Sequence, residues 1–294
     1  MSSASENACR RLDDARFAAG VRDGVSRIAD LIDRELALDD DVVHDGVTQD
    51  DVVAATTQLR ALFTVLAAQL GPDPDAWQVT TVGAALELMH QATLCHYDVA
   101  EDEDDVAEDE DDVAEDAASE DGGAEGRAAY RARVSSAILT GDHRYATASR
   151  LGSRLGPEAF GVIAETFAEV VTGQMRQKRY TATHFENAEH HLRIAREKSG
   201  SLLAACGRLG ALCAGAPDDV IARMGRLGHL VGVTVHLGSV EASGELPGIR
   251  AAAASHAARA HQELVELPDS EIRQAFSILV DSVYPGGESE QRSH

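Results

Sequence analysis

Hydrophobic residues recur at intervals of three and four along most of the chain, which is the period of an amphipathic helix. The first helix that this pattern predicts runs over about residues 6–36. A second follows residues 48–51, which resemble a capping box. A third runs over about 76–95. A Gly-Pro-Asp-Pro turn at 71–74 separates the second helix from the third.

The same period continues after residue 130, where prolines and glycines mark the ends of the expected helices. Pro157 and Pro217 fit first-turn positions, because the N–H that proline lacks has no partner there. No segment shows the alternation typical of a β-strand. We therefore predict an all-α protein, a single domain over residues 1–294 that packs long helices around one core. The later helices are expected near 130–155, 157–179, 184–199, 201–215, 217–235, 247–267 and 268–284.

An acidic insertion at about 98–126 interrupts this regularity. Its heptapeptide Asp-Val-Ala-Glu-Asp-Glu-Asp at 98–104 is repeated at 105–111 and begun again at 112–116. On a helix, copies seven residues apart differ by only about 20° in direction, so their carboxylates would face nearly the same way. Two interpretations stay open. The segment is either a solvated acidic loop grown by repeat slippage or a row of carboxylates that holds a divalent cation.

The composition restricts both the core and the partners. Aromatic residues make up only 4% of the chain, so the core is expected to consist of Ala, Leu, Val and Ile. A net charge of −24 argues against nucleic-acid binding, because a phosphate backbone requires a basic face. Lys178 and Lys198 are the only lysines. An acidic, lysine-poor surface indicates a halophilic source, although a GC-rich genome would give a similar composition.

The cysteines and the hydropathy pattern indicate the compartment. None of the four cysteines has metal-binding spacing, and all are expected as reduced thiols in apolar helices. No signal peptide opens the sequence, and no apolar run approaches the roughly 20 residues of a membrane span. We therefore expect a cytoplasmic protein with no integral membrane segment. The cysteines are Cys9, Cys95, Cys206 and Cys213.

Four segments between residues 83 and 215 form a collinear set of landmarks. They read GAALELMHQATLCH at 83–96, AILTGD at 137–142, GQMRQ at 173–177, and EKS followed by LL and LGALCAG between 197 and 215. Each piece is short, but their order and spacing together resemble those of one family over about 56–235. The chain is identified on these residues as a member of the trans-isoprenyl diphosphate synthase, or polyprenyl synthetase, family.

The resemblance implies an isoprenoid-synthase helical bundle with a central cavity and prenyl diphosphates as ligands. In that family the first aspartate-rich motif binds Mg²⁺, which neutralises the allylic diphosphate as it leaves. Residual substrate-binding roles are implied for Arg60, His96, Gln177 and Lys198. The candidate ligands for Mg²⁺ are Asp98, Glu101, Asp104, Asp105 and Glu108.

Both aspartate-rich motifs depart from the family pattern. Tyr97 stands where the first motif has its first carboxylate, and a phenol is a poor Mg²⁺ ligand. The three carboxylates of the second motif are replaced by Ser239, Val240 and Ser243. Glu125 stands where the family has an arginine, which reverses the sign of the interaction with a diphosphate. The sequence therefore assigns no catalytic residue.

Three functions are compatible with this partial loss of the aspartate-rich motifs. The first is a catalytically impaired subunit or regulator that packs against an active prenyl synthase paralogue. The second is an active Mg²⁺-dependent prenyltransferase, which elongates allylic diphosphates with isopentenyl diphosphate through a metal site displaced into the acidic repeat. The third is a homodimer that binds a prenyl chain or another lipid in the inherited apolar cavity.

Overall fold

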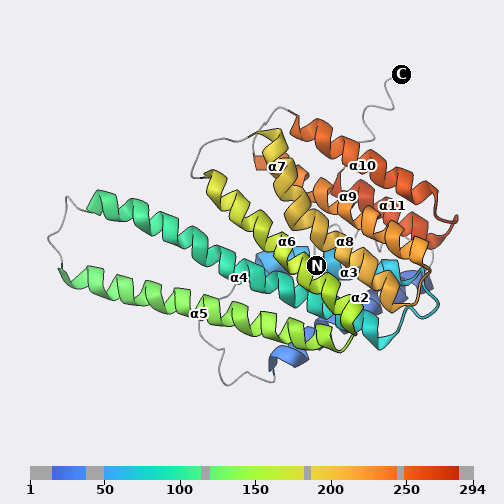
Figure 1. The fold of residues 1–294 in the computed structure, drawn as a ribbon, viewed down its shortest axis with the longest axis horizontal. Helices are drawn as coiled ribbons and strands as arrows, with labels where there is room; N and C mark the ends of the chain where they lie inside the picture. Colours follow the sequence, from blue (N-terminus) through green and yellow to red (C-terminus); the bar gives the residue numbers. More distant parts are fainter. Residues whose placement is uncertain (1–14, 38–49, 114–119, 182–186, 244–247, 285–294) are drawn as a thin grey trace.

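The computed structural model describes residues 15–37, 50–113, 120–181, 187–243 and 248–284. Side chains are described in these ranges except at 50–58, 98–129, 180–181 and 242–243. Every regular element among the described residues is helical, which confirms the predicted all-α fold (Figure 1). The elements are α2 (Ala15–Ala37), α3 (Asp50–Ala68), α4 (Trp77–Val113), α5 (Glu120–Ser153), α6 (Pro157–Thr181), α7 (Ala188–Ala195), the π-helix η1 (Arg196–Gly200), α8 (Ser201–Cys213), α9 (Asp218–Ser243), α10 (Ile249–Val265) and α11 (Glu271–Val283).

The core is built from apolar side chains of helices along the whole described chain. Helix α8 packs against α3, α4, α6 and α9. Phe63 of α3 meets Phe276 of α11 edge to face, with ring centroids 5.2 Å apart. As the composition predicts, aliphatic residues supply most of the rest. Fully buried members include Ile28, Leu66, Leu86, Met89, Leu151, Leu209, Met224 and Leu227.

Helices α4 and α5 are longer than the sequence pattern predicts. Helix α4 continues past residue 95 to Val113, and α5 begins at Glu120. The two lie side by side and extend beyond the other helices (Figure 1). The loop interpretation of the acidic insertion is therefore wrong for 98–113 and 120–126, whereas 114–119 lies outside the described residues. From 84 to 113, α4 contains neither Gly nor Pro, and the Ala and Glu of the repeat favour a helix.

The helix expected at about 184–199 is divided in two. Helix α7 begins after Asn187, whose side chain accepts a hydrogen bond from the His190 backbone N–H at 2.8 Å. After Ala195 the backbone widens into the π-helix η1 before α8 begins. Such π turns are frequent at functional sites, and this one contains Lys198.

The described cysteines are free thiols. Cys95 and Cys206 are buried and Cys213 is partly buried, while Cys9 lies outside the described residues. Burial raises the pKa of Cys206 and of Cys213 to about 12, so both stay protonated at neutral pH. In the part of the chain that the structure describes, no helix has the length and apolarity needed to cross a membrane.

Glycines allow α8 and α9 to approach until their backbones touch. A Cβ atom on Gly228 would lie 2.2 Å from the Leu203 carbonyl oxygen, and one on Gly232 would lie 2.1 Å from that of Ser199. A Cβ on Gly207 would meet the Met224 carbonyl oxygen at 2.3 Å. Because these obstacles are backbone atoms, no side-chain rotation relieves them. The spacing of the two helices is therefore fixed by glycine.

Two substitutions in α9 test this close contact. Gly228→Ala is expected to lower the free energy of unfolding by about 1–3 kcal/mol, because the added methyl group forces the helices apart. Gly225→Ala is the matched control, since its Cβ would have only ordinary contacts at 3.7 Å and beyond. That change is expected to raise stability by about 0.5–1 kcal/mol through helix propensity. Urea unfolding measures both, and equal effects would contradict this account.

Candidate functional site

Helices α4, α6 and α9 and the π-helix η1 bring a group of polar side chains together. Tyr97 and Gln177 contact Lys198, and the charge of Lys198 acts on His90 and His236. We call it the Lys198 cluster, defined by His90, Tyr97, Gln177, Lys198 and His236. Two of its members, Gln177 and Lys198, are substrate-binding candidates from the sequence.

Lys198 is the centre of this cluster. Its Nζ atom lies 4.8 Å from the centroid of the Tyr97 ring, which is a cation–π distance. The same atom donates a hydrogen bond to Gln177 Oε1 at 2.7 Å. A Cβ on Gly173 would come within 2.7 Å of the Lys198 Cγ, so glycine in α6 makes room for the lysine stem. The structure thus joins Gln177 and Lys198 directly.

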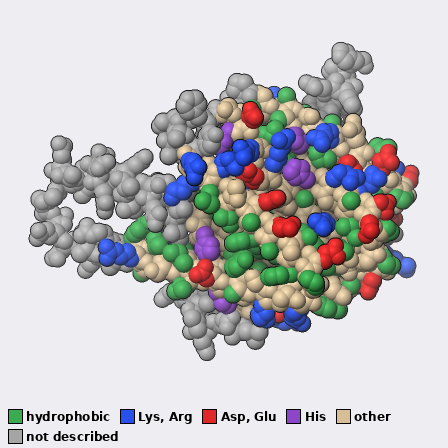
Figure 2. All heavy atoms as spheres, in the orientation of Figure 1, with side chains coloured by type: hydrophobic (Ala, Val, Ile, Leu, Met, Phe, Trp, Pro, Cys, Tyr) green, Lys and Arg blue, Asp and Glu red, His purple; other side chains and the backbone are tan. Residues whose placement is uncertain are grey.

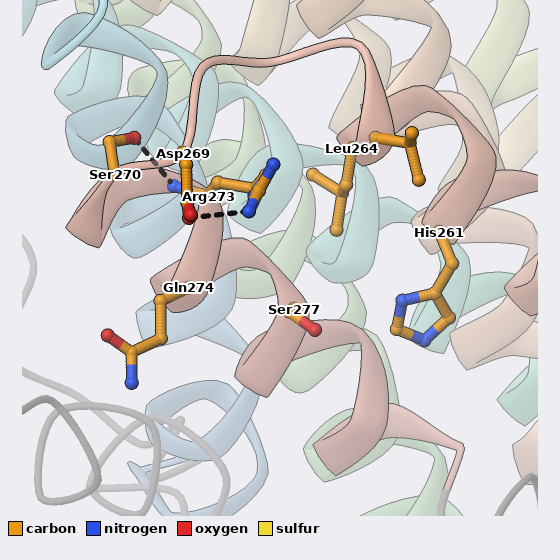
Figure 3. A pocket seen from close by; sticks show the side chains of 8 residues that line it. His261, Leu264, Asp269, Ser270, Arg273, Gln274 and Ser277 are labelled. Atoms are coloured by element: carbon orange, nitrogen blue, oxygen red, sulfur yellow. Dashed lines mark hydrogen bonds and ion pairs between the residues drawn. The ribbon is translucent and has the colours of Figure 1, made fainter.

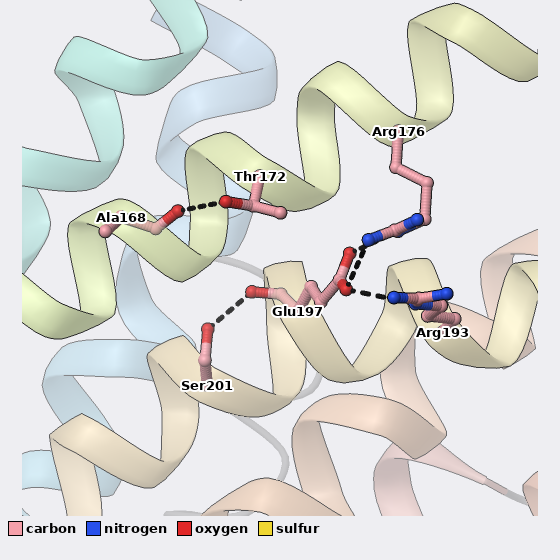
Figure 4. Close-up of polar contacts among 6 residues, drawn as sticks. All are labelled: Ala168, Thr172, Arg176, Arg193, Glu197 and Ser201. Carbon is pink, nitrogen blue, oxygen red and sulfur yellow. Dashed lines mark hydrogen bonds and ion pairs between the residues drawn. The ribbon is translucent and has the colours of Figure 1, made fainter.

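Glu197, the residue before Lys198, links η1 to α6 through an ion pair with Arg176. Glu197 accepts two hydrogen bonds from Arg176, at 2.8 and 3.0 Å, and one from Arg193 at 3.3 Å (Figure 4). Its backbone carbonyl also accepts from Ser201 Oγ at 2.6 Å. Desolvation raises the pKa of Glu197, but hydrogen bonding and charge from Arg176, and then from Arg193, lower it more, so the net shift is downward. Glu197 therefore stays ionised and neutralised by arginine.

Arg60 has a different partner from the one that the sequence suggests. Its guanidinium forms a two-pronged ion pair with Glu87 of α4, with Nε–Oε2 and Nη2–Oε1 distances of 2.7 and 2.9 Å. Arg60 is 7% exposed and Glu87 is fully buried. The residual substrate-binding role of Arg60 stays a prediction, because a diphosphate would have to compete with this carboxylate.

His90 is a member of the site that the sequence analysis missed. Burial, and then the charges of Arg60 and Lys198, lower its pKa well below the usual value, so the imidazole is neutral at pH 7. Its Nδ1 atom is buried and has no hydrogen-bond partner among the described residues. Glu87 and His90 are ionisable residues about one turn apart in the mostly apolar stretch of α4 at 82–92. This pair of ionisable residues within an apolar stretch is the sequence signal that could have identified His90.

His96 of α4 is paired with Asp142 of α5. The His96 Nε2 is 3.2 Å from the Asp142 Oδ1. A Cβ on Gly141 would come within 2.4 Å of the same nitrogen, so α5 packs closely here. The structure therefore places His96 against α5, and its residual substrate-binding role stays a prediction.

The end of α9 carries the residues that replace the second aspartate-rich motif. Ser239 is exposed, and its hydroxyl donates to the His236 carbonyl at 2.7 Å. Glu241 accepts a hydrogen bond from Arg250 at 2.6 Å. His236 Nδ1 lies 3.2 Å from Ser199 Oγ. Burial, then the charges of Lys198 and His191, lower the pKa of His236 to about 4.

The described donors do not suit Mg²⁺, which prefers carboxylate and carbonyl oxygens. No group of three or more His, Cys, Asp or Glu residues that could hold a metal occurs where the structure describes side chains. The cluster itself supplies an ammonium, a phenol, an amide and two imidazoles. The side chains of Asp98, Glu101, Asp104, Asp105 and Glu108 lie outside the described ones, so their role as ligands stays a prediction.

A pocket lies between α10 and α11 (Figure 3). It has a volume of about 630 Å³ and is lined in part by His261, Ser270 and Arg273. Arg273 is paired with Asp269 at 2.5 Å, so its charge is already neutralised. His261 lies 3.0 Å from Asp281.

Comparison with known proteins decides the family. A sequence model of the polyprenyl synthetase family matches residues 48–235, which is more than half of the chain. The chain belongs to the polyprenyl synthetase family. This confirms the resemblance that its sequence landmarks carry, and the matched range includes every described member of the Lys198 cluster except His236.

Three relatives and one solved structure show how the chain resembles other members. It is 47% identical to dimethylallyltranstransferase of Mycobacterium tuberculosis, over 77% of this chain and 64% of that protein. It is 42% identical to nonaprenyl diphosphate synthase of the same organism, over 81% and 68%. For heptaprenyl diphosphate synthase component 2 of Geobacillus stearothermophilus, the identity is 33% over 63% and 52%. The chain thus spans about two-thirds or less of these relatives' lengths.

The fold of this polyprenyl synthetase family member matches that of solved synthases. Geranylgeranyl pyrophosphate synthase from Corynebacterium glutamicum, complexed with calcium and isoprenyl diphosphate, gives a TM-score of 0.69. The two chains are 25% identical, and the match covers 95% of this chain and 100% of the other. The predicted isoprenoid-synthase fold is therefore confirmed.

The pKa of His236 predicts how stability depends on pH. The unfolded chain protonates this histidine near pH 6.5, whereas the folded chain does so only near pH 4. Between these values the unfolded state binds more protons, so stability falls as the pH falls. His236→Gln is expected to make this slope shallower by up to about 1.4 kcal/mol per pH unit. Chemical unfolding at pH 4–7 measures it, and an unchanged slope would contradict the assignment.

Proposed function

We propose that this chain is a catalytically impaired subunit of a heteromeric prenyl diphosphate synthase. It would pack against an active paralogue and shape the product length or the stability of that partner. The observation that carries the proposal is the contact between Lys198 and Tyr97. Where active members of the family are expected to hold a metal-binding carboxylate, this chain has an aromatic ring under an ammonium group.

The second aspartate-rich motif supports the same proposal. Ser239 hydrogen-bonds within its own helix, and Glu241 is engaged by Arg250. Neither arrangement gives α9 a set of carboxylate oxygens directed at a shared metal ion. The fold matches that of a solved synthase with a TM-score of 0.69, so the proposed loss would concern the chemistry and not the scaffold.

One relative supports the idea of a partner subunit. The protein from Geobacillus stearothermophilus is named as component 2 of a heptaprenyl diphosphate synthase, which describes an enzyme with more than one component. For this chain, a prenyl synthase paralogue is therefore a reasonable partner, and prenyl diphosphates are the expected ligands.

Exposed hydrophobic residues on α5 and α6 provide a surface for such a partner. Exposed apolar side chains that gather on one face are typical of protein–protein contacts. Figure 2 shows hydrophobic side chains gathered over the region in which α5 and α6 lie in Figure 1. Leu139 is the most exposed of the large hydrophobic residues on these helices, at 67%. The set is Ile138, Leu139, Tyr145, Phe160 and Met175.

A prenyltransferase assay tests the proposal. The chain alone is expected to give no elongation of allylic diphosphates with isopentenyl diphosphate and Mg²⁺. Mixed with its nearest paralogue that keeps both aspartate-rich motifs, it is expected to change the rate or the product length. Leu139→Glu is expected to abolish that change, because a buried charge opposes association. Turnover by the chain alone, at a rate typical of synthases, would contradict the proposal.

The control for this experiment is Val265→Glu. Val265 is 72% exposed on α10, so the substitution adds the same charge at an exposed apolar position away from α5 and α6. It is expected to leave the effect on the partner unchanged. If both variants abolish the effect, or neither does, the α5–α6 surface is not the contact.

An active enzyme with a displaced metal site is the second candidate. It is favoured by the helix α4, which continues through the acidic repeat to Val113, and by relatives that are named as synthases. This candidate predicts Mg²⁺-dependent turnover by the chain alone, and its loss when Asp104, Asp105 and Glu108 are all replaced by alanine. Turnover that survives the triple substitution would exclude the repeat as the metal site.

A further inference from the structure

We propose that a cationic cluster on the surface formed by η1, α9 and α10 binds a phosphate group, either as free phosphate or in the headgroup of an anionic lipid. We call it the Arg259 cluster, defined by Arg196 of η1, His229 of α9, and His256 and Arg259 of α10. The proposal concerns binding alone, and it does not depend on whether the chain is catalytically impaired.

Two ion pairs fix how α9 and α10 lie against each other. Arg226 of α9 is joined to Glu263 of α10 by two hydrogen bonds of 3.1 Å. Further along α9, Glu241 accepts a hydrogen bond from Arg250 of α10 at 2.6 Å. The residue numbers rise along one helix as they fall along the other. The two helices therefore run antiparallel in a fixed register.

This register brings three members of the cluster together. His229 lies about one turn after Arg226 on α9, and Arg259 lies about one turn before Glu263 on α10. The two residues therefore meet one turn further along the same helix contact. His256 lies one turn before Arg259 and is only 6% exposed, and its Nδ1 is 2.8 Å from a backbone carbonyl oxygen of α10.

The π-helix η1 supplies the fourth member. A Cβ on Gly200 would come within 2.9 Å of the His229 Nδ1, so the imidazole packs directly against this turn. Arg196 lies four residues before Gly200, about one turn, and therefore on the same side of η1. Arg196 and Arg259 are exposed, whereas His229 is half-buried. The two guanidinium groups thus stand at the surface above a floor of imidazoles.

The arginines of this cluster have no carboxylate partner. Neither Arg196 nor Arg259 forms a side-chain hydrogen bond or an ion pair with any residue that the structure describes. Glu263, one turn away on α10, is already held by Arg226 and lies 3.7 Å from Arg223. The chain has 50 acidic and only 26 basic residues, so a shortage of carboxylates does not explain this. An anion from outside the chain is the partner that the cluster fits.

The pKa of His229 supports this arrangement. Burial is the largest cause that lowers it, followed by the charges of the other three members of the cluster. A hydrogen bond with the Gly200 backbone acts in the opposite direction. A bound anion would offset the repulsion from the arginines, so it would raise the pKa of His229.

The geometry favours a phosphate group over a carboxylate. A planar carboxylate is satisfied by a single guanidinium in a two-pronged pair. A phosphate group has strong acceptor oxygens that point in several directions and carries up to two negative charges. It can therefore accept hydrogen bonds from η1, α9 and α10 at once.

NMR titration of His229 with inorganic phosphate tests the proposal on the full chain. In about 0.1 M NaCl the Debye length is about 10 Å, so the distant carboxylates of this acidic chain are screened. Phosphate is expected to raise the pKa of His229. Arg196→Gln and Arg259→Gln are each expected to weaken phosphate binding by about fivefold or more, because a charge-assisted hydrogen bond is lost.

Arg22→Gln is the matched control. Arg22 is an exposed arginine of α2, outside the cluster, so the substitution removes the same charge from another part of the surface. This variant is expected to bind phosphate as the wild type does. All three substituted side chains are exposed, so each variant is expected to fold. Equal affinities of the three variants would overturn the proposal.

Vesicle sedimentation distinguishes the two sources of phosphate. Binding to phosphatidylglycerol vesicles but not to phosphatidylcholine vesicles, lost in Arg259→Gln and kept in Arg22→Gln, would support a lipid headgroup. Binding of inorganic phosphate without a preference for anionic vesicles would support free phosphate. If neither binds, the proposal is overturned. Binding of polyglutamate alone would also overturn it, because the partner would then be an acidic protein.

Discussion

The close backbone contact between α9 and the segment formed by η1 and α8 is the constraint on which the candidate site depends. Gly228 and Gly232 of α9 lie where any Cβ would strike the carbonyl oxygens of Leu203 and Ser199. Ser199 belongs to η1, so the same contact that closes the core also fixes the turn that carries Lys198. A wider spacing would move the ammonium relative to Tyr97 and His236. The chemistry of the cluster therefore depends on residues that have no side chains.

A second, polar constraint lies deeper in the bundle. The ion pair between Arg60 and Glu87 joins α3 to α4 in a place where almost no water reaches. Removing one member of such a pair costs about 3–5 kcal/mol, because the other charge is left buried without compensation. Burial, and then the charge of Arg60, lowers the pKa of the nearby His90 and keeps that imidazole neutral. In this part of α4, Glu87 and His90 thus belong both to the buried core and to the surroundings of the candidate site.

Much of the fold, and less of the site, follows from the sequence. The three-and-four periodicity predicts helices such as α6 and α8 closely, because most of their regularly spaced apolar residues are buried in the core. The continuation of α4 to Val113 was missed because acidic residues were interpreted as the end of a helix, although Ala and Glu sustain one. The landmark motifs supplied Gln177 and Lys198 as candidates. Their hydrogen bond, by contrast, joins different elements, so local patterns contain no information about it. The role of Tyr97 as a ring beneath the lysine is likewise visible only in three dimensions.

The central claim, made under the proposed function, is that this member of the polyprenyl synthetase family is catalytically impaired because no metal ion bridges the diphosphate to the protein. A crystal structure with pyrophosphate and Mn²⁺, the metal located by anomalous scattering, tests it most directly. The account predicts no Mn²⁺ that bridges pyrophosphate to the protein. Mn²⁺ bridging the pyrophosphate to Asp98, Glu101 or the carboxylates of the acidic repeat would contradict it.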